Sequence, residues 1–180
     1  NINVLQNGHF ILSSGLHSEH YLQCAKIFEH PKIAEKICKQ LADKIVKKIN
    51  INNIDKIVSP AVGGIIAGYE LSKHLGLDNI FLERVKGEFT LRRGFEIRKN
   101  EKILIIEDVV STGKSSRETF KVIVENGAEI VAEACIVNRS GKDNPFSNIE
   151  FISLINLELA TYEPHLIPDH LKKIHPIKPG

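Results

Sequence analysis

Apolar residues recur at two different spacings along the chain, and the two spacings predict helices and strands. In the segment 31–49, Lys and Glu occupy many positions and the apolar residues lie four apart: Ile33, Ile37, Leu41, Ile45 and Ile49. This spacing places the apolar side chains on one face of a helix, and Pro31 suits its first turn. Segments 65–75 and 115–126 have helical patterns and are each followed by a glycine, so we expect helices there too.

Short apolar runs alternate with these helices along the chain. They are Ile57–Val58, Ile80–Leu82, Lys102–Ile106, Ile130–Val137 and Phe151–Ile155. Strands that alternate with helices form βαβ units. We therefore expect an α/β fold with a central, mostly parallel sheet flanked by helices. No internal repeat or low-complexity linker divides the sequence, so residues 1–180 are expected to form a single domain.

The composition excludes several classes of protein. Apolar residues make up 42% and charged residues 26% of the chain, as in ordinary globular proteins. The net charge is +2 with both signs mixed along the chain, so we expect no nucleic-acid partner. There is no apolar run of about 18 residues, so we expect no membrane span. Cys24, Cys38 and Cys135 are widely spaced, which favours free thiols and a cytoplasmic location.

Residues 103–116 combine an apolar run, two carboxylates and a small polar turn. Glu107 and Asp108 follow Ile103–Ile106, and the turn Ser111-Thr112-Gly113 leads into the expected helix. Backbone N–H groups at a helix N-terminus bind anions, and a glycine allows a phosphate to approach closely. Two carboxylates would repel that phosphate unless they contact sugar hydroxyls or a divalent cation. The segment therefore predicts a site for a phosphorylated sugar and Mg²⁺ at the carboxyl ends of strands.

Two other interpretations of this segment fail. Gly113-Lys114-Ser115 looks like the end of a P-loop, but that motif requires a glycine where this chain has Asp108. An ordinary strand, turn and helix would not explain two carboxylates at the end of an apolar strand, because charge there is costly without a partner.

The same segment resembles the phosphoribosyl pyrophosphate (PRPP) motif of the type I phosphoribosyltransferases. That motif has four apolar residues, Glu/Asp-Asp, two apolar residues, Ser/Thr-Thr-Gly and a small residue, and Lys114 departs from it where the family most often has glycine. The resemblance implies a type I phosphoribosyltransferase-like fold. It also implies that PRPP binds to Glu107, Asp108, Val109, Val110, Ser111, Thr112, Gly113, Lys114 and Ser115, with the two carboxylates on the ribose hydroxyls and residues 111–115 on the 5′-phosphate.

Further segments resemble the orotate phosphoribosyltransferases in particular. Residues 8–18 and 21–23 are similar to the N-terminal hood, which we place within residues 1–30. Residues 59–64 are similar to the turn that meets pyrophosphate, and residues 83–95 to a mobile catalytic loop. The resemblance implies transfer of the 5-phosphoribosyl group from PRPP to orotate, which gives orotidine 5′-monophosphate and pyrophosphate in pyrimidine (UMP) biosynthesis.

The resemblance also assigns roles to single residues. Arg84 and Lys86 of the loop, together with Asp108, are the implied catalytic residues, and Arg84 also meets PRPP. Arg139 offers a planar fork that suits the orotate carboxylate. The remaining orotate contacts are implied for Ser111, Tyr21 and Leu22. In the family the loop covers the neighbouring subunit's site, which implies a homodimer.

Magnesium is the one implied cofactor. It is expected to be held mainly through PRPP, with Glu107 and Asp108 as candidate protein ligands. The family's pyrophosphate ligands differ at several positions of this chain, which leaves those contacts open: Ser13, Val62, Gly63, Glu88 and Thr90. A phosphoribosyltransferase for purine bases would lack the hood and Arg139. A PRPP-binding regulator would need a nucleic-acid module or a basic face.

Overall fold

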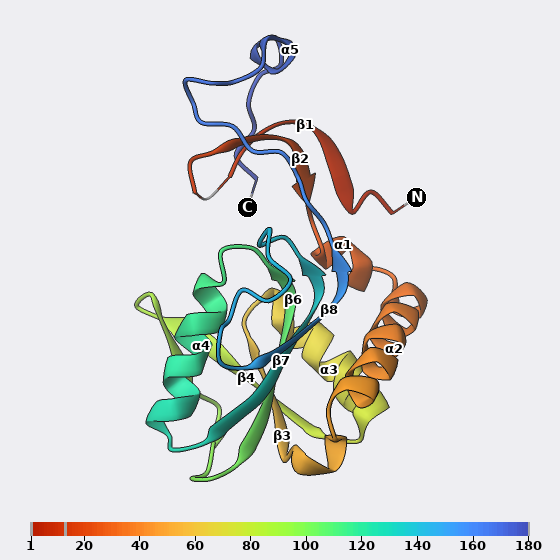
Figure 1. Ribbon diagram of the computed structural model, residues 1–180, viewed down its shortest axis with the longest axis vertical. Helices are drawn as coiled ribbons and strands as arrows, with labels where there is room; N and C mark the ends of the chain where they lie inside the picture. Colours follow the sequence, from red (N-terminus) through yellow and green to blue (C-terminus); the bar gives the residue numbers. More distant parts are fainter. Residues whose placement is uncertain (1, 13, 180) are drawn as a thin grey trace.

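The computed structural model describes residues 2–12 and 14–179, and its main body is a six-stranded sheet covered by helices (Figure 1). The strand order is β5-β4-β3-β6-β7-β8. All neighbours are parallel except β4 and β5. The expected mostly parallel sheet is therefore confirmed. The strands are β3 (Lys56–Pro60), β4 (Asp78–Val85), β5 (Glu88–Leu91), β6 (Lys102–Val110), β7 (Glu129–Asn138) and β8 (Glu150–Asn156).

Helices cover both faces of this sheet. The helices α2 (Pro31–Lys48) and α3 (Gly63–Leu75) lie on one face, and α4 (Lys114–Glu125) lies on the other (Figure 1). Alternate side chains of β6 pack against the helices on the two faces of the sheet. Leu104 and Ile106 pack with α2 and α3, whereas Ile103 and Ile105 pack with Ile123 of α4. The short helices are α1 (Ala25–Phe28), η1 (Ile51–Asn53) and α5 (Asp169–Lys172). In the part of the chain that the structure describes, no helix has the length and apolar character of a bilayer span.

The strand β6 is longer than the sequence predicts. We expected it to end at Ile106, but its pairing with β7 continues to Val110, which lies opposite Asn138. Glu107 and Asp108 are therefore part of the strand rather than of the turn after it. Because side chains alternate along a strand, the two carboxylates point to opposite faces of the sheet.

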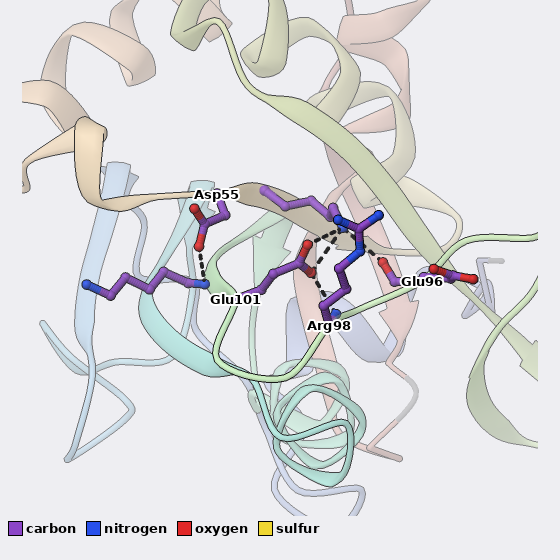
Figure 2. A network of polar contacts seen from close by, with 6 residues as sticks. Asp55, Glu96, Arg98 and Glu101 are labelled. Carbon is purple, nitrogen blue, oxygen red and sulfur yellow. Dashed lines mark hydrogen bonds and ion pairs between the residues drawn. The ribbon is translucent and has the colours of Figure 1, made fainter.

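The amino-terminal edge of the sheet is fixed by a polar network, which Figure 2 shows. Lys56 Nζ donates to Glu101 Oε1 at 3.0 Å and to the backbone carbonyl of Glu96 at 2.9 Å. The Lys102 N–H donates to Asp55 Oδ2 at 2.8 Å. Lys56 and Lys102 begin β3 and β6, so this network anchors the ends of these strands that lie away from the phosphate turn.

The hood combines the N-terminal hairpin with the C-terminal tail. The strands β1 (Leu5–Ile11) and β2 (His17–Leu22) pair antiparallel. Figure 1 shows the tail beside them, above the sheet. Tyr162 and His17 exchange backbone hydrogen bonds of 2.8 and 2.9 Å, and Ile177 pairs with Phe10. A two-stranded hairpin alone is only marginally stable in water. The tail therefore contributes part of the hood, which the sequence placed within residues 1–30.

Side chains reinforce this contact between the hood and the tail. The buried His9 places Nδ1 2.9 Å from the carbonyl of Ile174. Glu19 accepts hydrogen bonds from Tyr162 Oη at 3.1 Å and from His170 Nε2 at 2.5 Å. The pKa of Glu19 is lowered, mainly by the hydrogen bond from His170. The tail is thus tied to both strands of the hairpin.

Candidate functional site

A cavity of about 520 Å³ lies between the hood and the carboxyl ends of β6 and β7. Its walls contain seven of the residues that the sequence predicts for PRPP or orotate: Tyr21, Leu22, Asp108, Val109, Ser111, Thr112 and Arg139. The structure thus brings together, from three separate parts of the sequence, the residues expected to meet the base and the ribose. Thr161 and Pro179 of the tail also line this cavity. The sequence analysis missed them, because the tail has no periodic pattern.

The two adjacent carboxyl groups, Glu107 and Asp108, are both buried in surroundings that disfavour their charged forms, and they lie on opposite faces of the sheet. Asp108 faces the cavity, whereas Glu107 is 6% exposed and points toward the α4 side. Burial raises the pKa of both carboxyl groups, and repulsion from Asp108 and Glu133 raises that of Glu107 further. A sugar hydroxyl or a cation would stabilise the charged forms. Asp108 is therefore suited to a ligand that brings such groups, whereas Glu107 faces away from this cavity.

The turn at residues 59–64 approaches this pair closely. A Cβ atom built on Gly63 would overlap the Asp108 carboxylate, so a larger side chain there would displace it. This gives a physical reason for one departure from the family pattern. The Ala61–Val62 peptide bond is cis. Beside the turn lies a second hollow of about 410 Å³, which Arg84 and Arg93 also line.

The phosphate turn has the geometry of an anion site. Gly113 precedes α4 with a φ of 70°, and a Cβ there would lie 2.8 Å from Phe146. The N-cap residue Gly113 has no side chain to cap α4, and Thr112 Oγ1 accepts only a long hydrogen bond of 3.4 Å from the Lys114 N–H. The N–H groups of the first turn can therefore bind an anion. Arg117 lies over the Phe146 ring and donates a hydrogen bond to the Thr112 carbonyl. These contacts fix the shape of the turn.

Besides Glu107 and Gly113, three residues of the predicted PRPP motif do not line the 520 Å³ cavity. Val110 is 2% exposed and packs in the cluster of Phe146. The Lys114 side chain is 78% exposed, and its Nζ is 3.9 Å from Glu118. Ser115 is half-buried in the first turn of α4. A side-chain contact with PRPP is therefore least supported for Val110, which belongs to the core.

Arg139 is a half-buried cation without an acidic partner among the described residues. Its backbone N–H donates to the Val110 carbonyl at 2.7 Å, which holds it at the cavity wall. The Nε atom is buried and has no hydrogen-bond partner among the described atoms. Burial lowers the pKa of this guanidinium. A carboxylate in the cavity would supply both the missing charge and the missing hydrogen bonds.

The predicted catalytic loop is a β-hairpin whose charges pair within it and with α4. Lys86 and Gly87 form its turn, with φ values of 50° and 92°. Arg84 pairs with Glu118 of α4, donates to the Gly87 carbonyl at 2.7 Å and lies 4.0 Å from the centre of the Phe89 ring. Neither Arg84 nor Lys86 lines the 520 Å³ cavity.

The remaining charged and polar positions of the loop are exposed or paired. Glu83 forms ion pairs with Arg92 and Arg93. Glu88 and Thr90, where the family often has other residues, are exposed on β5. Ser13, the departure in the hood, lies outside the described residues. The pyrophosphate ligands therefore stay a prediction.

Comparison with known proteins agrees with this geometry. Residues 24–158 match the family model described as phosphoribosyl transferase domain. The orotate phosphoribosyltransferase of Bartonella henselae is 46% identical over 98% of this chain and 91% of its own, and that of Maricaulis maris is 46% identical over 98% and 90%.

Solved structures show the same fold. The orotate phosphoribosyltransferase from Aeropyrum pernix has a TM-score of 0.73 at 19% identity, covering 87% of this chain and 89% of that one. The adenine phosphoribosyltransferase of Leishmania tarentolae has a TM-score of 0.61 at 19% identity, covering 77% of each chain. With the family match across residues 24–158 and 46% identity over nearly the whole length, the chain belongs to the orotate phosphoribosyltransferase family of phosphoribosyl transferase domain enzymes.

Proposed function

We propose that this enzyme transfers the 5-phosphoribosyl group from PRPP to N1 of orotate, which gives orotidine 5′-monophosphate and pyrophosphate for pyrimidine (UMP) synthesis. The relatives named above support the pair of substrates. The observation that carries the choice of orotate is Arg139. It is a partly desolvated guanidinium without an acidic partner among the described residues, in the wall of the cavity that Asp108 also lines.

The reaction requires mainly positioning and electrostatic stabilisation. The transition state is oxocarbenium-like at C1 of the ribose, so the two substrates must be held in line with little water. Asp108, which lines the cavity, is proposed to accept the ribose hydroxyls, and residues 111–115 to hold the 5′-phosphate. Glu107 points to the other face of the sheet, so its contact with the ribose stays a prediction. Arg139 and Ser111 would bind the acidic edge of orotate. The backbone at Tyr21 and Leu22 would bind the other edge.

The pyrophosphate is proposed to leave toward the second hollow. The pyrophosphate turn and Arg84 both line that hollow, which supports a place for anions there. Arg84 is now paired with Glu118, so it would exchange that partner for the leaving group. Lys86, at the exposed hairpin turn, would join when the hairpin closes as a lid.

Mg²⁺ is the proposed cofactor, and the residues present fit a shared site. Among the described residues, no group of three or more side chains has the arrangement of a metal site. The substrate would therefore provide most ligands, with Asp108 as the candidate protein ligand in the cavity. Glu107, the other predicted ligand, faces the α4 side. When bound, Mg²⁺ neutralises charge on the pyrophosphate. Activity should be lost on chelation with EDTA and restored by added Mg²⁺.

We also propose a homodimer in which the hairpin reaches the neighbouring site. An exposed row of apolar side chains next to the pyrophosphate turn supports a contact there with a second copy of the chain. Val62, Ile66 and Tyr69 of the α3 region are 82%, 48% and 60% exposed. Tyr69→Lys should shift the protein from dimer to monomer in sedimentation, whereas a monomeric wild type would refute the proposal. A cytoplasmic location is proposed from the three free, buried cysteines.

A substrate panel tests the proposed reaction. Orotate, uracil, adenine and hypoxanthine are each incubated with PRPP and Mg²⁺, and loss of the base is followed by ultraviolet absorbance. We expect turnover of orotate alone. Turnover of a purine base with no turnover of orotate would refute the proposed substrate.

A further inference from the structure

A fully buried carboxyl group lies beneath the phosphate turn and takes no part in the proposed reaction. Glu133 is 0% exposed in β7, opposite Ile105 of β6 and two residues before the position that pairs with Glu107. Ser116 Oγ donates a hydrogen bond of 2.7 Å to Glu133 Oε1. The second oxygen, Oε2, is buried without a hydrogen-bond partner among the described atoms. One carboxyl oxygen of Glu133 therefore accepts a hydrogen bond, and the other is buried without one among the described atoms.

Stability does not explain a carboxyl group at this position. An aliphatic side chain at position 133, together with an apolar residue at position 116, would fill the space between β7 and α4 without burying a carboxyl group. Burial raises the pKa of Glu133 to about 8, although the hydrogen bond from Ser116 and the charge of Arg117 oppose the shift. At neutral pH the group is therefore protonated, and it still leaves one oxygen unpaired. What this carboxyl group adds to the structure is the hydrogen bond that it accepts from Ser116.

That hydrogen bond ends in the first turn of α4. Ser116 is 1% exposed and follows directly after residues 111–115, and the N-cap residue Gly113 has no side chain to cap this helix. The direction of the first N–H groups therefore depends on how the turn rests on the sheet. Thr119, one turn later on the same buried face, is 0% exposed and its hydroxyl has no partner among the described atoms. Ser116 thus carries the polar contact between this face of α4 and Glu133.

We propose that Glu133 is a positioning residue for the phosphoribosyl site, which holds the first turn of α4 through Ser116 so that its N–H groups face the 5′-phosphate. The inference rests on the proposed function, because it assumes that residues 111–115 bind that phosphate. Glu133 itself touches no substrate. Its removal should therefore weaken the use of PRPP while leaving the orotate side of the cavity intact.

Two substitutions at Glu133 separate positioning from packing. Glu133→Gln keeps a neutral acceptor of the same shape, whereas Glu133→Leu removes the acceptor. For Glu133→Leu we expect the KM for PRPP to rise roughly ten-fold, the effect of one lost hydrogen bond, with the orotate KM within about two-fold of wild type. Glu133→Gln should restore the PRPP KM to within about two-fold of wild type. Both kinetic constants are measured beside the thermal midpoint.

Ser116→Ala provides the same test if Glu133→Leu does not fold. It should raise the PRPP KM as Glu133→Leu does, and the double variant should show no further rise, because both remove one interaction. Thr119→Val is the matched control on the same face and should leave the PRPP KM unchanged. An unchanged PRPP KM in Glu133→Leu or Ser116→Ala would overturn the inference. So would a parallel rise of both KM values with a lowered midpoint, which indicates a structural role.

The wild-type assay distinguishes failure of this inference from failure of the proposed function. If wild type does not use PRPP and orotate, the proposed function is wrong. If wild type is active and the Glu133 variants behave as it does, only the positioning role is wrong.

Discussion

Removal of the Arg139 side chain should weaken orotate binding without weakening the fold. In the free protein this guanidinium has no acidic partner among the described residues and has a buried, unsatisfied Nε. Loss of the partner of a buried charge costs about 2–5 kcal/mol. Because Arg139 is only half-buried, we expect the lower part of that range, about 2–3 kcal/mol, or roughly 30- to 150-fold in affinity.

The assay compares two bases and two properties of the protein. For Arg139→Ala, kcat/KM for orotate should fall by this factor, whereas the weak binding of uracil, which lacks the carboxylate and is measured as inhibition, should hardly change. The thermal midpoint should fall by less than about 2 °C, because no folded-state ion pair is lost. Arg139→Lys keeps the charge but loses the planar fork, so its kcat/KM for orotate should lie between those of wild type and Arg139→Ala. A lowered midpoint with unchanged orotate kinetics would show that Arg139 is structural and would refute this reasoning.

Four further predictions concern the ribose, the lid and the buried acid. Asp108→Asn should keep the fold and lower kcat/KM for PRPP by roughly 10- to 150-fold, the loss of one charged hydrogen bond of about 1.5–3 kcal/mol; unchanged PRPP kinetics would defeat the assignment. Gly63→Ala should displace the Asp108 carboxylate and raise the PRPP KM while the orotate KM stays constant, as steady-state kinetics would show. Arg84→Ala should lower kcat more than it raises the orotate KM, because this charge acts on the leaving group; a change in the orotate KM alone would give the hairpin another role. Burial raises the pKa of Glu133 to about 8 in the folded state. The protonated group therefore contributes its full share of stability below the pKa of the unfolded chain, and this contribution is lost as pH rises to about 8. Between pH 5 and 8 the free energy of unfolding of wild type should therefore fall relative to Glu133→Gln, by at most about 1.4 kcal/mol per pH unit; parallel curves in urea titrations would contradict it.

Local patterns of the sequence were sufficient to predict most of the sheet and one wall of the site. The apolar run before Glu107 has no charge to compete with burial, so its strand and its place in the centre of the sheet follow directly. The turn Ser111-Thr112-Gly113 was predicted because each residue type has a local reason to be there. The lining of the cavity by Tyr21 and Arg139 followed from the resemblance, not from spacing.

The rest depends on contacts between distant segments. The tail joins the hood through backbone hydrogen bonds of Tyr162 and Ile177, and such bonds leave no periodic signal in the side chains. The charge of Arg84 is compensated by Glu118, which lies in another element. Glu133 was overlooked because a single acid within an apolar strand is indistinguishable from an exposed edge residue until the covering helix is known.

A crystal structure of the complex with orotidine 5′-monophosphate tests the central claim most directly. The account predicts the orotate carboxylate within hydrogen-bond distance of the Arg139 guanidinium. It also predicts the 5′-phosphate on the N–H groups of residues 111–115 and the ribose hydroxyls at Asp108. A nucleotide bound in this cavity with its carboxylate away from Arg139, or with its phosphate away from residues 111–115, would contradict it.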